Sequence, residues 1–344
     1  MCKPQVSRQP FHNNYQDTGS LKNAASFPIG ASINVRLLRS DSLYRKTILE
    51  NFNSVTAENA MKWEATEPIQ DNYNMSDADD LVNFALKNNL RIHGHNLAWY
   101  QGNPQWLENF KGERSDWQQL LRRHIQTIMN RYKGKINSWD VINEAFDGDG
   151  KYRINNIWGK HLGNEYIVEA FRIAHETDPK ALLFYNDYGM EESSSKSDAI
   201  LKLIDQLKRS KIPINGVGLQ MHINIHTPDQ AISSTIKKFA ATGLLIHISE
   251  LDIRINEKEN KLLSLNKSLD DQQAEKYHFL VSAYKTLVPY KQQFGITTWD
   301  VGDKDSWIRR LYCTNDWPLL FDDNYSKKQS YFSFLHALKS DQPL

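Results

Sequence analysis

The sequence predicts an α/β fold of the (β/α)8, or TIM barrel, class, built as a single domain. Eight short runs of apolar or β-branched residues follow one another along the chain, and longer segments with helical spacing of apolar residues lie between them. Strand and helix alternating in this way is the sequence form of a parallel barrel. The length of 344 residues fits one such barrel, although length alone leaves two average domains open.

The predicted strands follow in chain order as FPIGAS (27–32), SVTAE (54–58), RIHGHNLAW (91–99), INSWDVINE (136–144), ALLFYND (181–187), INGVGLQMH (214–222), LLIHISELDI (244–253) and FGITTWDV (294–301). Helical periodicity predicts helices over 77–89, 116–132, 165–177, 197–210, 228–242 and 272–288. No repeat, low-complexity tract or internal linker interrupts this order. We therefore expect residues 24–344 to form one barrel.

Residues 1–23 are polar and unpatterned, and we expect them to form a tail. Their start, MCKPQVSRQP, leaves two interpretations open: an ordinary disordered tail, or the mature end of a bacterial lipoprotein with a lipid anchor at Cys2. The sequence begins without the apolar core of a signal peptide. Cys2 and Cys313 are the only cysteines, so no disulfide framework or cysteine-based zinc site can form.

The charge balance narrows the class of partner. The 42 basic and 41 acidic residues nearly cancel, so we expect no nucleic-acid partner and no anionic membrane surface, which both require a surplus of positive charge. No run reaches the roughly 18 apolar residues of a membrane span. With 9 Trp, 15 Tyr and 14 Phe, the chain can spare aromatic rings to line a cleft for flat neutral ligands such as sugars.

Polar side chains gather where the predicted strands end. Active sites of (β/α)8 barrels lie at the carboxyl ends of the strands, so these residues are functional candidates. If these strand ends were only exposed to solvent, so many polar residues would not be needed there. They are Glu58, Asn59, His95, Asn143, Glu144, Asn186, Asp187, Gln220, His222, Glu250, Asp252, Trp299 and Asp300.

Glu144 and Glu250, at the ends of the fourth and seventh strands, are placed to flank a glycosidic bond across the barrel mouth. One carboxyl group would protonate the leaving oxygen, and the other would attack the anomeric carbon or activate water. Separations of about 5 Å and about 6.5–9.5 Å distinguish retention from inversion, and the sequence leaves both open. The acid needs a raised pKa, which burial or the nearby charge of Glu250 would supply.

The alternation of side chains along a strand predicts which residues lie beside Glu250 and hold its carboxylate in place. Glu250 and Asp252 are two residues apart and share a face, as do Gln220 and His222 on the preceding strand. A histidine between two carboxylates can bond to each through one ring nitrogen, which would orient Glu250 and keep it ionised. We expect His222 in that position, although a plain core histidine remains the alternative.

Eight ordered motifs carry a resemblance to a known family, from about residue 27 to 337. They are NSVTAENAMKWE (53–64), GHNLAW (94–99), WDVINEAF (139–146), YNDYGME (185–191), GVGLQMH (216–222), ISELDI (248–253), TTWDVGDKDSW (297–307) and PLLFDDNY (318–325). The chain resembles the family 10 glycoside hydrolases, the endo-1,4-β-xylanases. The resemblance implies cleavage of internal β-1,4-xylosidic bonds of xylan and xylo-oligosaccharides, with retention of configuration, and it implies no cofactor or metal.

The resemblance also implies roles for individual residues. Glu144 matches the acid/base and Glu250 the nucleophile of a two-glutamate double displacement, and Asn143 matches the residue that holds the 2-hydroxyl. The other matches are Glu58, Asn59 and Lys62 on the glycone side, His95 and Trp99 around the cleaved sugar, Trp299 and Trp307 enclosing the rings, and Gln220, His222 and Asp252 around the nucleophile.

Four positions depart from the family pattern. Tyr100 stands where a His is usual and Gly102 where a Gln is usual, while Asp300 and Gly302 replace a Gly and a Thr. We expect catalysis to survive these changes and the glycone-side sites to differ. Asp300 would shift the pH optimum if its carboxylate pointed into the cleft.

Three other functions stay open on the sequence. His93 and His95 form a His-x-His pair that would suit a metal-dependent barrel hydrolase, but such barrels carry the pair on the first strand. A catalytically silent sugar-binding barrel would be expected to lack one of the two glutamates. A β-glucan in place of xylan keeps the mechanism and changes the sugar. We expect a monomer that is secreted, periplasmic or held at the outer surface of a bacterium, because a polymer such as xylan is met outside the cytoplasm.

Overall fold

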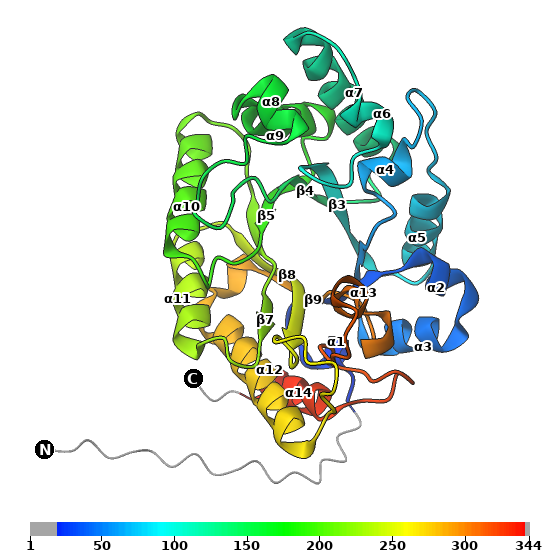
Figure 1. Cartoon of the computed structure of the whole chain (residues 1–344), viewed down its shortest axis with the longest axis vertical. Helices are drawn as coiled ribbons and strands as arrows, with labels where there is room; N and C mark the ends of the chain where they lie inside the picture. The colour runs from blue at the N-terminus through cyan, green and yellow to red at the C-terminus, as the bar shows by residue number, and fades with distance from the viewer. Residues whose placement is uncertain (1–18, 341–344) are drawn as a thin grey trace, which may run out of the picture.

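Parallel strands form a closed ring surrounded by helices in the computed structural model, which describes residues 19–340 (Figure 1). The strands are β1 (Ile29–Ile33), β2 (Ser54–Ala57), β3 (Arg91–Trp99), β4 (Ser138–Asn143), β5 (Leu182–Asp187), β6 (Gly216–Leu219), β7 (His222–Asn224), β8 (Leu245–Arg254) and β9 (Gln293–Thr298). The ladder order runs from β6 through β5, β4, β3, β2, β1 and β9 to β8, and β6 also pairs with β8. This last pairing closes the ring, so the predicted (β/α)8 barrel is confirmed.

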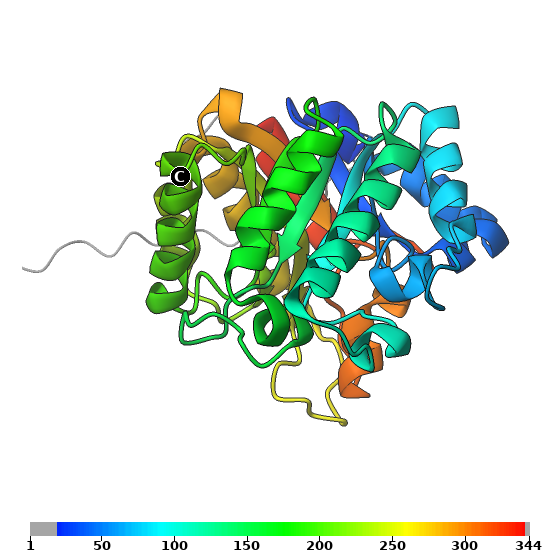
Figure 2. The ribbon, with the colours of Figure 1, turned by 90° about the horizontal axis from the view of Figure 1, so that it is seen from above.

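Helices connect the strands and pack outside them, as Figure 2 shows from a second direction. The longer ones are α3 (Ser42–Asn51), α5 (Ser76–Lys87), α7 (Arg114–Tyr132), α9 (Glu165–Thr177), α10 (Ser194–Arg209), α11 (Asp229–Ala240), α12 (Lys267–Leu287) and α14 (Gln329–Lys339). The shorter ones are α1 (Leu21–Ala24), α2 (Val35–Ser40), α4 (Trp63–Thr66), α6 (Gln105–Glu108), α8 (Ile157–Leu162) and α13 (Trp307–Tyr312).

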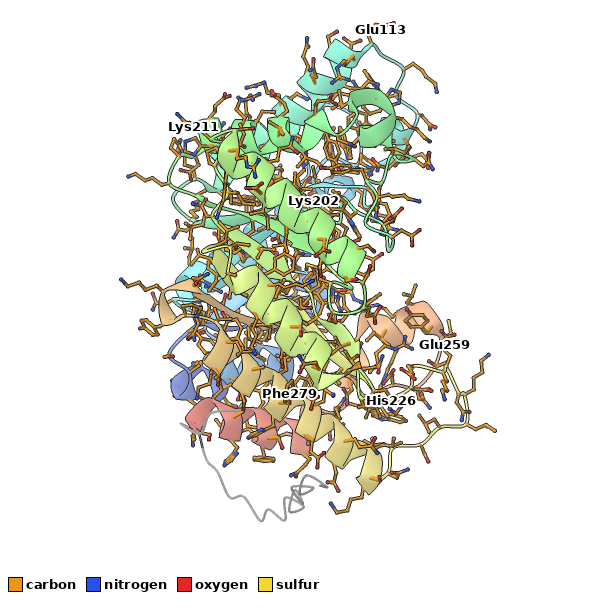
Figure 3. All side chains as sticks on the ribbon, turned by 90° about the vertical axis from the view of Figure 1, so that its left-hand side faces the viewer. Glu113, Lys202, Lys211, His226, Glu259 and Phe279 are labelled. Atoms are coloured by element: carbon orange, nitrogen blue, oxygen red, sulfur yellow. The ribbon has the colours of Figure 1, made fainter. Side chains whose placement is uncertain are left out.

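Amphipathic spacing explains why these segments are helical. On α10, the apolar side chains of Ile200, Leu203, Ile204 and Leu207 are buried, and their spacing of three or four puts them on one face. The side chain of Ser193 accepts from the Lys196 amide and so caps the first turn. Figure 3 shows α10, α11 and α12 from outside the barrel, where they carry Lys202 and Phe279 among their labelled side chains.

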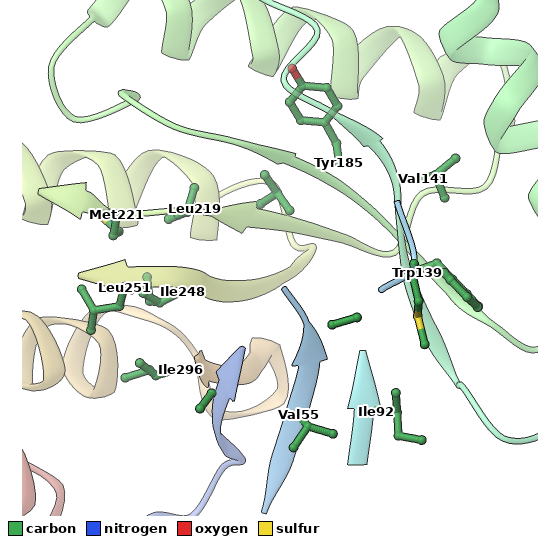
Figure 4. Close-up of a cluster of buried hydrophobic side chains, with 14 of the residues drawn as sticks. Val55, Ile92, Trp139, Val141, Tyr185, Leu219, Met221, Ile248, Leu251 and Ile296 are labelled. Atoms are coloured by element: carbon green, nitrogen blue, oxygen red, sulfur yellow. The ribbon is translucent and has the colours of Figure 1, made fainter. Parts of the chain in front are cut away.

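Alternating side chains of the strands build two packing layers. One set packs beneath the helices, and Figure 4 shows Val55, Ile92, Trp139 and Ile296 of neighbouring strands within it. The other set fills the barrel interior, where the rings of His93 and His247 have centroids 5.0 Å apart, and those of Phe184 and Phe294 4.5 Å apart. These rings close the barrel below its mouth, so ligands have access from the strand carboxyl ends.

The predicted strand 214–222 is divided in the structure. β6 ends at Leu219, Met221 has a positive φ of 58°, and β7 then pairs with the end of β8, with His222 opposite Asp252. Gln220 still bonds to both neighbouring strands, because its backbone amide donates to the Asp187 carbonyl and its carbonyl accepts from the Glu250 amide. The chain changes direction at the next residue, Met221.

The start of the fold also differs from the sequence boundary at residue 24. Leu21 in α1 is fully buried, and α1 contacts α14. Residues 20–23, which we assigned to the tail, are therefore packed with the barrel, while Cys2 lies outside the described residues. Over residues 19–340, no helix combines the length and the apolar character that crossing a membrane requires.

Candidate functional site

A cleft of about 780 Å³ opens at the carboxyl ends of the strands. The thirteen residues that match the family's site residues line it: Glu58, Asn59, Lys62, His95, Trp99, Asn143, Glu144, Gln220, His222, Glu250, Asp252, Trp299 and Trp307. The other strand-end candidates, Asn186, Asp187 and Asp300, do not line it. They come from seven strands, β2, β3, β4, β6, β7, β8 and β9, and the loops that follow them, which the barrel brings to one edge. The structure therefore gathers residues that are up to about 250 positions apart in the chain.

Glu144 lies directly after β4 in a strained backbone conformation, with φ at 57°. Its amide donates to the Asn186 carbonyl at 2.8 Å, which holds the turn. Positive φ is uncommon for a residue with a branched or long side chain and is found where surrounding contacts enforce it, often at functional sites. The turn directs the carboxylate into the cleft, where it is 8% exposed.

Three donors surround the Glu144 carboxylate. The Trp99 indole donates to Oε2 at 2.9 Å, while the amides of Asn143 and Gln220 donate to Oε1 at 3.1 and 3.0 Å. These bonds favour the ionised form. Burial nevertheless raises the pKa of Glu144, and the charges of Asp187 and Glu250 raise it further. The sequence analysis predicted burial and the charge of Glu250 as causes of the raised pKa, but not the charge of Asp187, which contributes more than that of Glu250.

Asp187 itself is held by an ion pair from outside the cleft. Lys196 of α10 approaches Asp187 Oδ1 to 2.8 Å, and both side chains are almost fully buried. The Tyr185 hydroxyl donates to the other oxygen at 2.5 Å and accepts from the Ala145 amide at 3.1 Å. Asp187 ends β5, the strand beside β4, and lies level with Glu144, because Asn143 and Asn186 are paired in the ladder.

Glu250, on β8, has the opposite electrostatic setting. Its Oε1 accepts from Asn186 at 2.6 Å, and its Oε2 lies 3.3 Å from His222 Nε2. Burial alone would raise the pKa of Glu250, but the hydrogen bond from His222 and the charge of His95 outweigh it and leave the pKa lowered. One buried glutamate therefore favours its proton and the other its charge, which is the division of roles that acid–base catalysis requires.

His222 bridges two carboxylates, as the sequence predicted. Its Nδ1 is 2.8 Å from Asp252, whose same oxygen accepts from the Trp307 indole at 2.9 Å. Burial lowers the pKa of His222, but Asp252 and Glu250 together raise it well above the ordinary value. A protonated His222 donates from both ring nitrogens, so it orients Glu250 and keeps it ionised.

Two amides link the glutamates. Asn143 donates to Glu144 and its carbonyl oxygen accepts from Asn186 at 2.8 Å, while Asn186 also donates to Glu250. The Ser249 hydroxyl donates to the Asn186 carbonyl oxygen at 2.6 Å, which fixes the orientation of that amide. Gln220, expected beside the nucleophile, instead donates to Glu144, because β6 ends just before it and aims it across the cleft.

The glycone-side residues predicted from the family motif lie together near β2. Lys62 Nζ donates to Asn59 at 2.7 Å and lies 4.9 Å from the centre of the Trp99 ring, and burial lowers its pKa. Glu58 accepts from Asn34 at 2.9 Å and from Arg310 of α13 at 2.6 Å. Arg310 was not predicted, since nothing in its local sequence indicates a partner 252 positions away.

The His-x-His pair converges on a carboxylate within the barrel. His93 Nε2 and His95 Nδ1 lie 3.0 and 2.8 Å from the two oxygens of Asp140 on β4. His95 remains at the cleft wall, with its ring 5.1 Å from that of Trp299. Among residues 19–340, no group of three or more His, Cys, Asp or Glu side chains has a metal-binding arrangement.

The departures at Asp300 and Gly302 are structural. Asp300 has φ at 84° and is 1% exposed, and it does not line the cleft. Its carboxylate instead accepts from the Trp307 amide at 2.9 Å, at the start of α13. The condition under which Asp300 would shift the pH optimum, a carboxylate pointing into the cleft, is therefore not met. Gly302 is needed for space, because a Cβ there would lie 2.8 Å from the Tyr325 ring.

The departures at Tyr100 and Gly102 do border the cleft wall. Tyr100 lines the cleft, and the Arg153 guanidinium lies 4.3 Å from its ring centre. Arg153 also donates to the Glu144 carbonyl at 3.1 Å and to the Tyr188 hydroxyl at 2.7 Å. Gly102 has φ at 62°, and a Cβ there would lie 3.2 Å from Trp99. An aromatic wall thus stands beside Glu144 where the family pattern has a histidine.

Further cleft residues were not predicted as site residues: Gln101, Tyr188, Glu192, Ile223, Asn224, Arg254, Glu257, Arg310, Leu311 and Tyr312. Asn186 was noted at its strand end, and its bonds to Asn143 and Glu250 place it in the site although it was assigned no role. Tyr188, two residues after Asn186, carried the same strand-end signal. The others follow from loop conformation, which strand patterns do not predict.

Comparisons with known proteins agree with this geometry. The family model described as glycosyl hydrolase family 10 matches residues 20–337. Endo-beta-1,4-xylanase Xyn10C of Cellvibrio japonicus is 34% identical over 345 residues, which cover 92% of this chain and 57% of that protein. Endo-1,4-beta-xylanase A of a Caldicellulosiruptor species is 39% identical over 325 residues, covering 90% of this chain and 46% of that protein. The chain thus spans about half the length of these two relatives.

Other relatives match over nearly their whole length. Endo-1,4-beta-xylanase B of Paenibacillus barcinonensis is 33% identical over 328 residues, which cover 92% of this chain and 97% of that protein. Among solved structures, xylanase10C of Cellvibrio japonicus in complex with xylopentaose has a TM-score of 0.90 at 33% identity, covering 95% of this chain and 70% of that one. Native xylanase 10B of Thermotoga maritima has a TM-score of 0.86 at 33% identity, covering 93% and 98%. The chain belongs to glycosyl hydrolase family 10.

Proposed function

We propose that this chain is an endo-1,4-β-xylanase, which cleaves internal β-1,4-xylosidic bonds of xylan and xylo-oligosaccharides with retention of anomeric configuration. The observation that carries the proposal is the pair of buried glutamates in one open cleft, with the pKa of Glu144 raised and that of Glu250 lowered. The xylanases named above are similar across nine-tenths of this chain. The open shape of the cleft suits an internal segment of a long neutral chain.

In the first proposed step, Glu250 attacks the anomeric carbon while Glu144 gives its proton to the leaving oxygen. The bond from carbon to the leaving sugar breaks as the bond to Glu250 forms, leaving a covalent glycosyl-enzyme. Glu144, now ionised, then removes a proton from water, and that water displaces Glu250. Inversion occurs twice, so the configuration is retained.

The surrounding residues have positioning roles in this proposal. His222 keeps Glu250 ionised and oriented, with Asp252 holding the other ring nitrogen. Asn143 binds the 2-hydroxyl of the reacting sugar. Glu58, Asn59 and Lys62 bind the glycone sugars, and Trp299 and Trp307 enclose their rings alongside His95 and Trp99.

The test is proton NMR of the anomeric signals during early hydrolysis of xylo-oligosaccharides. We expect the β-anomer first. Initial release of the α-anomer would overturn the mechanism, and absence of cleavage by the unaltered chain would overturn the activity. Parallel assays on a mixed-linkage β-glucan distinguish a change of sugar, and full activity after exhaustive chelation excludes the metal-dependent alternative.

We further propose that the chain acts as a monomer outside the cytoplasm, because xylan is a polymer that must be met there. The catalytic unit, predicted as residues 24–344, would begin at about residue 20, because Leu21 is buried against the barrel. A lipid anchor at Cys2 is a separate proposal, tested by metabolic labelling with a radioactive fatty acid in a bacterial host. Labelling that persists in Cys2→Ser would refute the anchor.

The proposed monomer is tested separately, by sedimentation of the purified chain, which would reveal any oligomer.

A further inference from the structure

Helix α13 forms one rim of the cleft and carries more cleft-lining side chains than the family motif explains. Trp307 at its start matches that motif, but Arg310, Leu311 and Tyr312 also line the cleft. Arg310 forms an ion pair with Glu58. Leu311 and Tyr312, at the end of the helix, have no role in the mechanism above.

Tyr312 is held against the strand that carries the nucleophile. The Arg254 guanidinium lies 4.0 Å from the centre of its ring, a cation–π contact. Arg254 is the last residue of β8, four residues beyond Glu250. At about 3.3 Å per strand residue, the two lie about 13 Å apart along the strand, so Tyr312 borders the cleft well above the nucleophile.

The support beneath Tyr312 is rigid. Arg254 donates to the buried Asp316 at 3.3 Å and to the Asn256 carbonyl at 3.1 Å, and only 16% of its side chain is exposed. Asp316 also accepts from the amides of Ile255 and Asn256. The loop after β8 and the loop after α13 are thereby joined, and Figure 3 shows the loop that carries Glu259 beside α13 at one edge of the molecule. A ring fixed in advance loses little freedom when a ligand binds.

Leu311, next to Tyr312, is 58% exposed although it is apolar. Exposed apolar surface gathered in a cleft rather than scattered marks a binding surface. The charge of Arg254 is already balanced by Asp316, and the nearby cleft residue Glu257 is acidic, so an anionic ligand is disfavoured. A flat aromatic ring beside an aliphatic side chain fits the apolar face of a neutral pyranose. Asn224, which is opposite Arg254 on the neighbouring strand β7, adds a polar side chain to the cleft lining.

We propose that Leu311 and Tyr312 form an additional sugar subsite at the rim of the cleft, which binds a neutral pyranose unit remote from the cleaved bond. This inference rests on the proposed xylanase function and adds to it a contact available only to longer chains. Substrates too short to reach α13 would not sense the subsite, so it would make the catalytic efficiency depend on chain length.

The test is kcat/KM for xylo-oligosaccharides of two to six units, measured on the unaltered chain, Tyr312→Ala and Tyr312→Phe. We expect Tyr312→Ala to lower kcat/KM about three- to tenfold for the longest substrates and to leave it unchanged for the shortest, because an aromatic contact has that value. Tyr312→Phe keeps the ring and should behave as the unaltered chain. Tyr290→Ala is the control, since Tyr290 is 73% exposed before β9, at the other end of the barrel.

The outcomes separate the two proposals. No cleavage of any substrate by the unaltered chain would refute the xylanase function itself. Cleavage by the unaltered chain with no effect of Tyr312→Ala at any length would refute the subsite alone. An equal loss at every length would also refute it, because that pattern indicates a disturbed scaffold.

Discussion

The indole of Trp99 offers a quantitative test of how the site sets the proton affinity of Glu144. The indole donates to Glu144 Oε2 at 2.9 Å, and a donor stabilises the ionised form. A hydrogen bond to a charged group contributes about 1.5–3 kcal/mol, and one pKa unit corresponds to about 1.36 kcal/mol. Because water can replace part of the lost bond, we use the lower end. Trp99→Phe should therefore raise the pKa of Glu144 by about one unit.

The assay is the pH dependence of kcat/KM on a xylo-oligosaccharide, whose alkaline limb reports the acid of the free enzyme. A raised pKa keeps Glu144 protonated to higher pH, so the limb should move upward by about one unit. The position of the limb is the readout, since loss of the larger ring also weakens binding. Trp307→Phe is the matched control, because its indole bonds to Asp252 rather than to Glu144. An unmoved or lowered limb in Trp99→Phe would refute the reasoning.

Three further predictions follow from buried charges. Glu250→Ala should lower kcat by about 10⁴-fold or more, with unchanged circular dichroism, and appreciable activity on xylan would contradict its role. Burial and the charge of Glu58 raise the pKa of Asp300 well above its ordinary value, so the folded state holds a proton that the unfolded state loses above about pH 4. The free energy of unfolding should therefore fall as the pH rises from there, and urea unfolding of Asp300→Asn should show a smaller dependence on pH. Lys196→Met strands the buried Asp187 and should cost about 3–5 kcal/mol of unfolding free energy, whereas Lys238→Met, which breaks an exposed pair, should cost less than about 1 kcal/mol.

The rim of the barrel was predictable because its geometry is simple. Parallel strands bring their carboxyl ends to one edge, so polar residues that end strands converge regardless of their separation in the chain. Glu144 and Glu250 were found in this way, and so was the bridging position of His222, since strand alternation sets which residues share a face.

The contacts that cross between elements were not predictable. Lys196 lies in an amphipathic helix, where a lysine ordinarily faces solvent, yet it is 1% exposed against Asp187. The Gln220 side chain bonds to Glu144 and not to Glu250 as predicted, because the strand before it ends early and the chain turns at Met221. Tyr312 and Arg310 depend on the course of α13, which lies in a segment without strong periodicity. Each of these contacts depends on where a loop travels, which side-chain patterning does not encode.

The two amides that link the glutamates form a directed series of hydrogen bonds, which deamidation would interrupt. Each amide of Asn143 and Asn186 uses its nitrogen as a donor and its oxygen as an acceptor within the chain. Deamidation of either one would convert a donor into an acceptor and add a third carboxylate between Glu144 and Glu250. The opposite pKa shifts of the two glutamates therefore depend on two side chains between them that are amides and carry no charge.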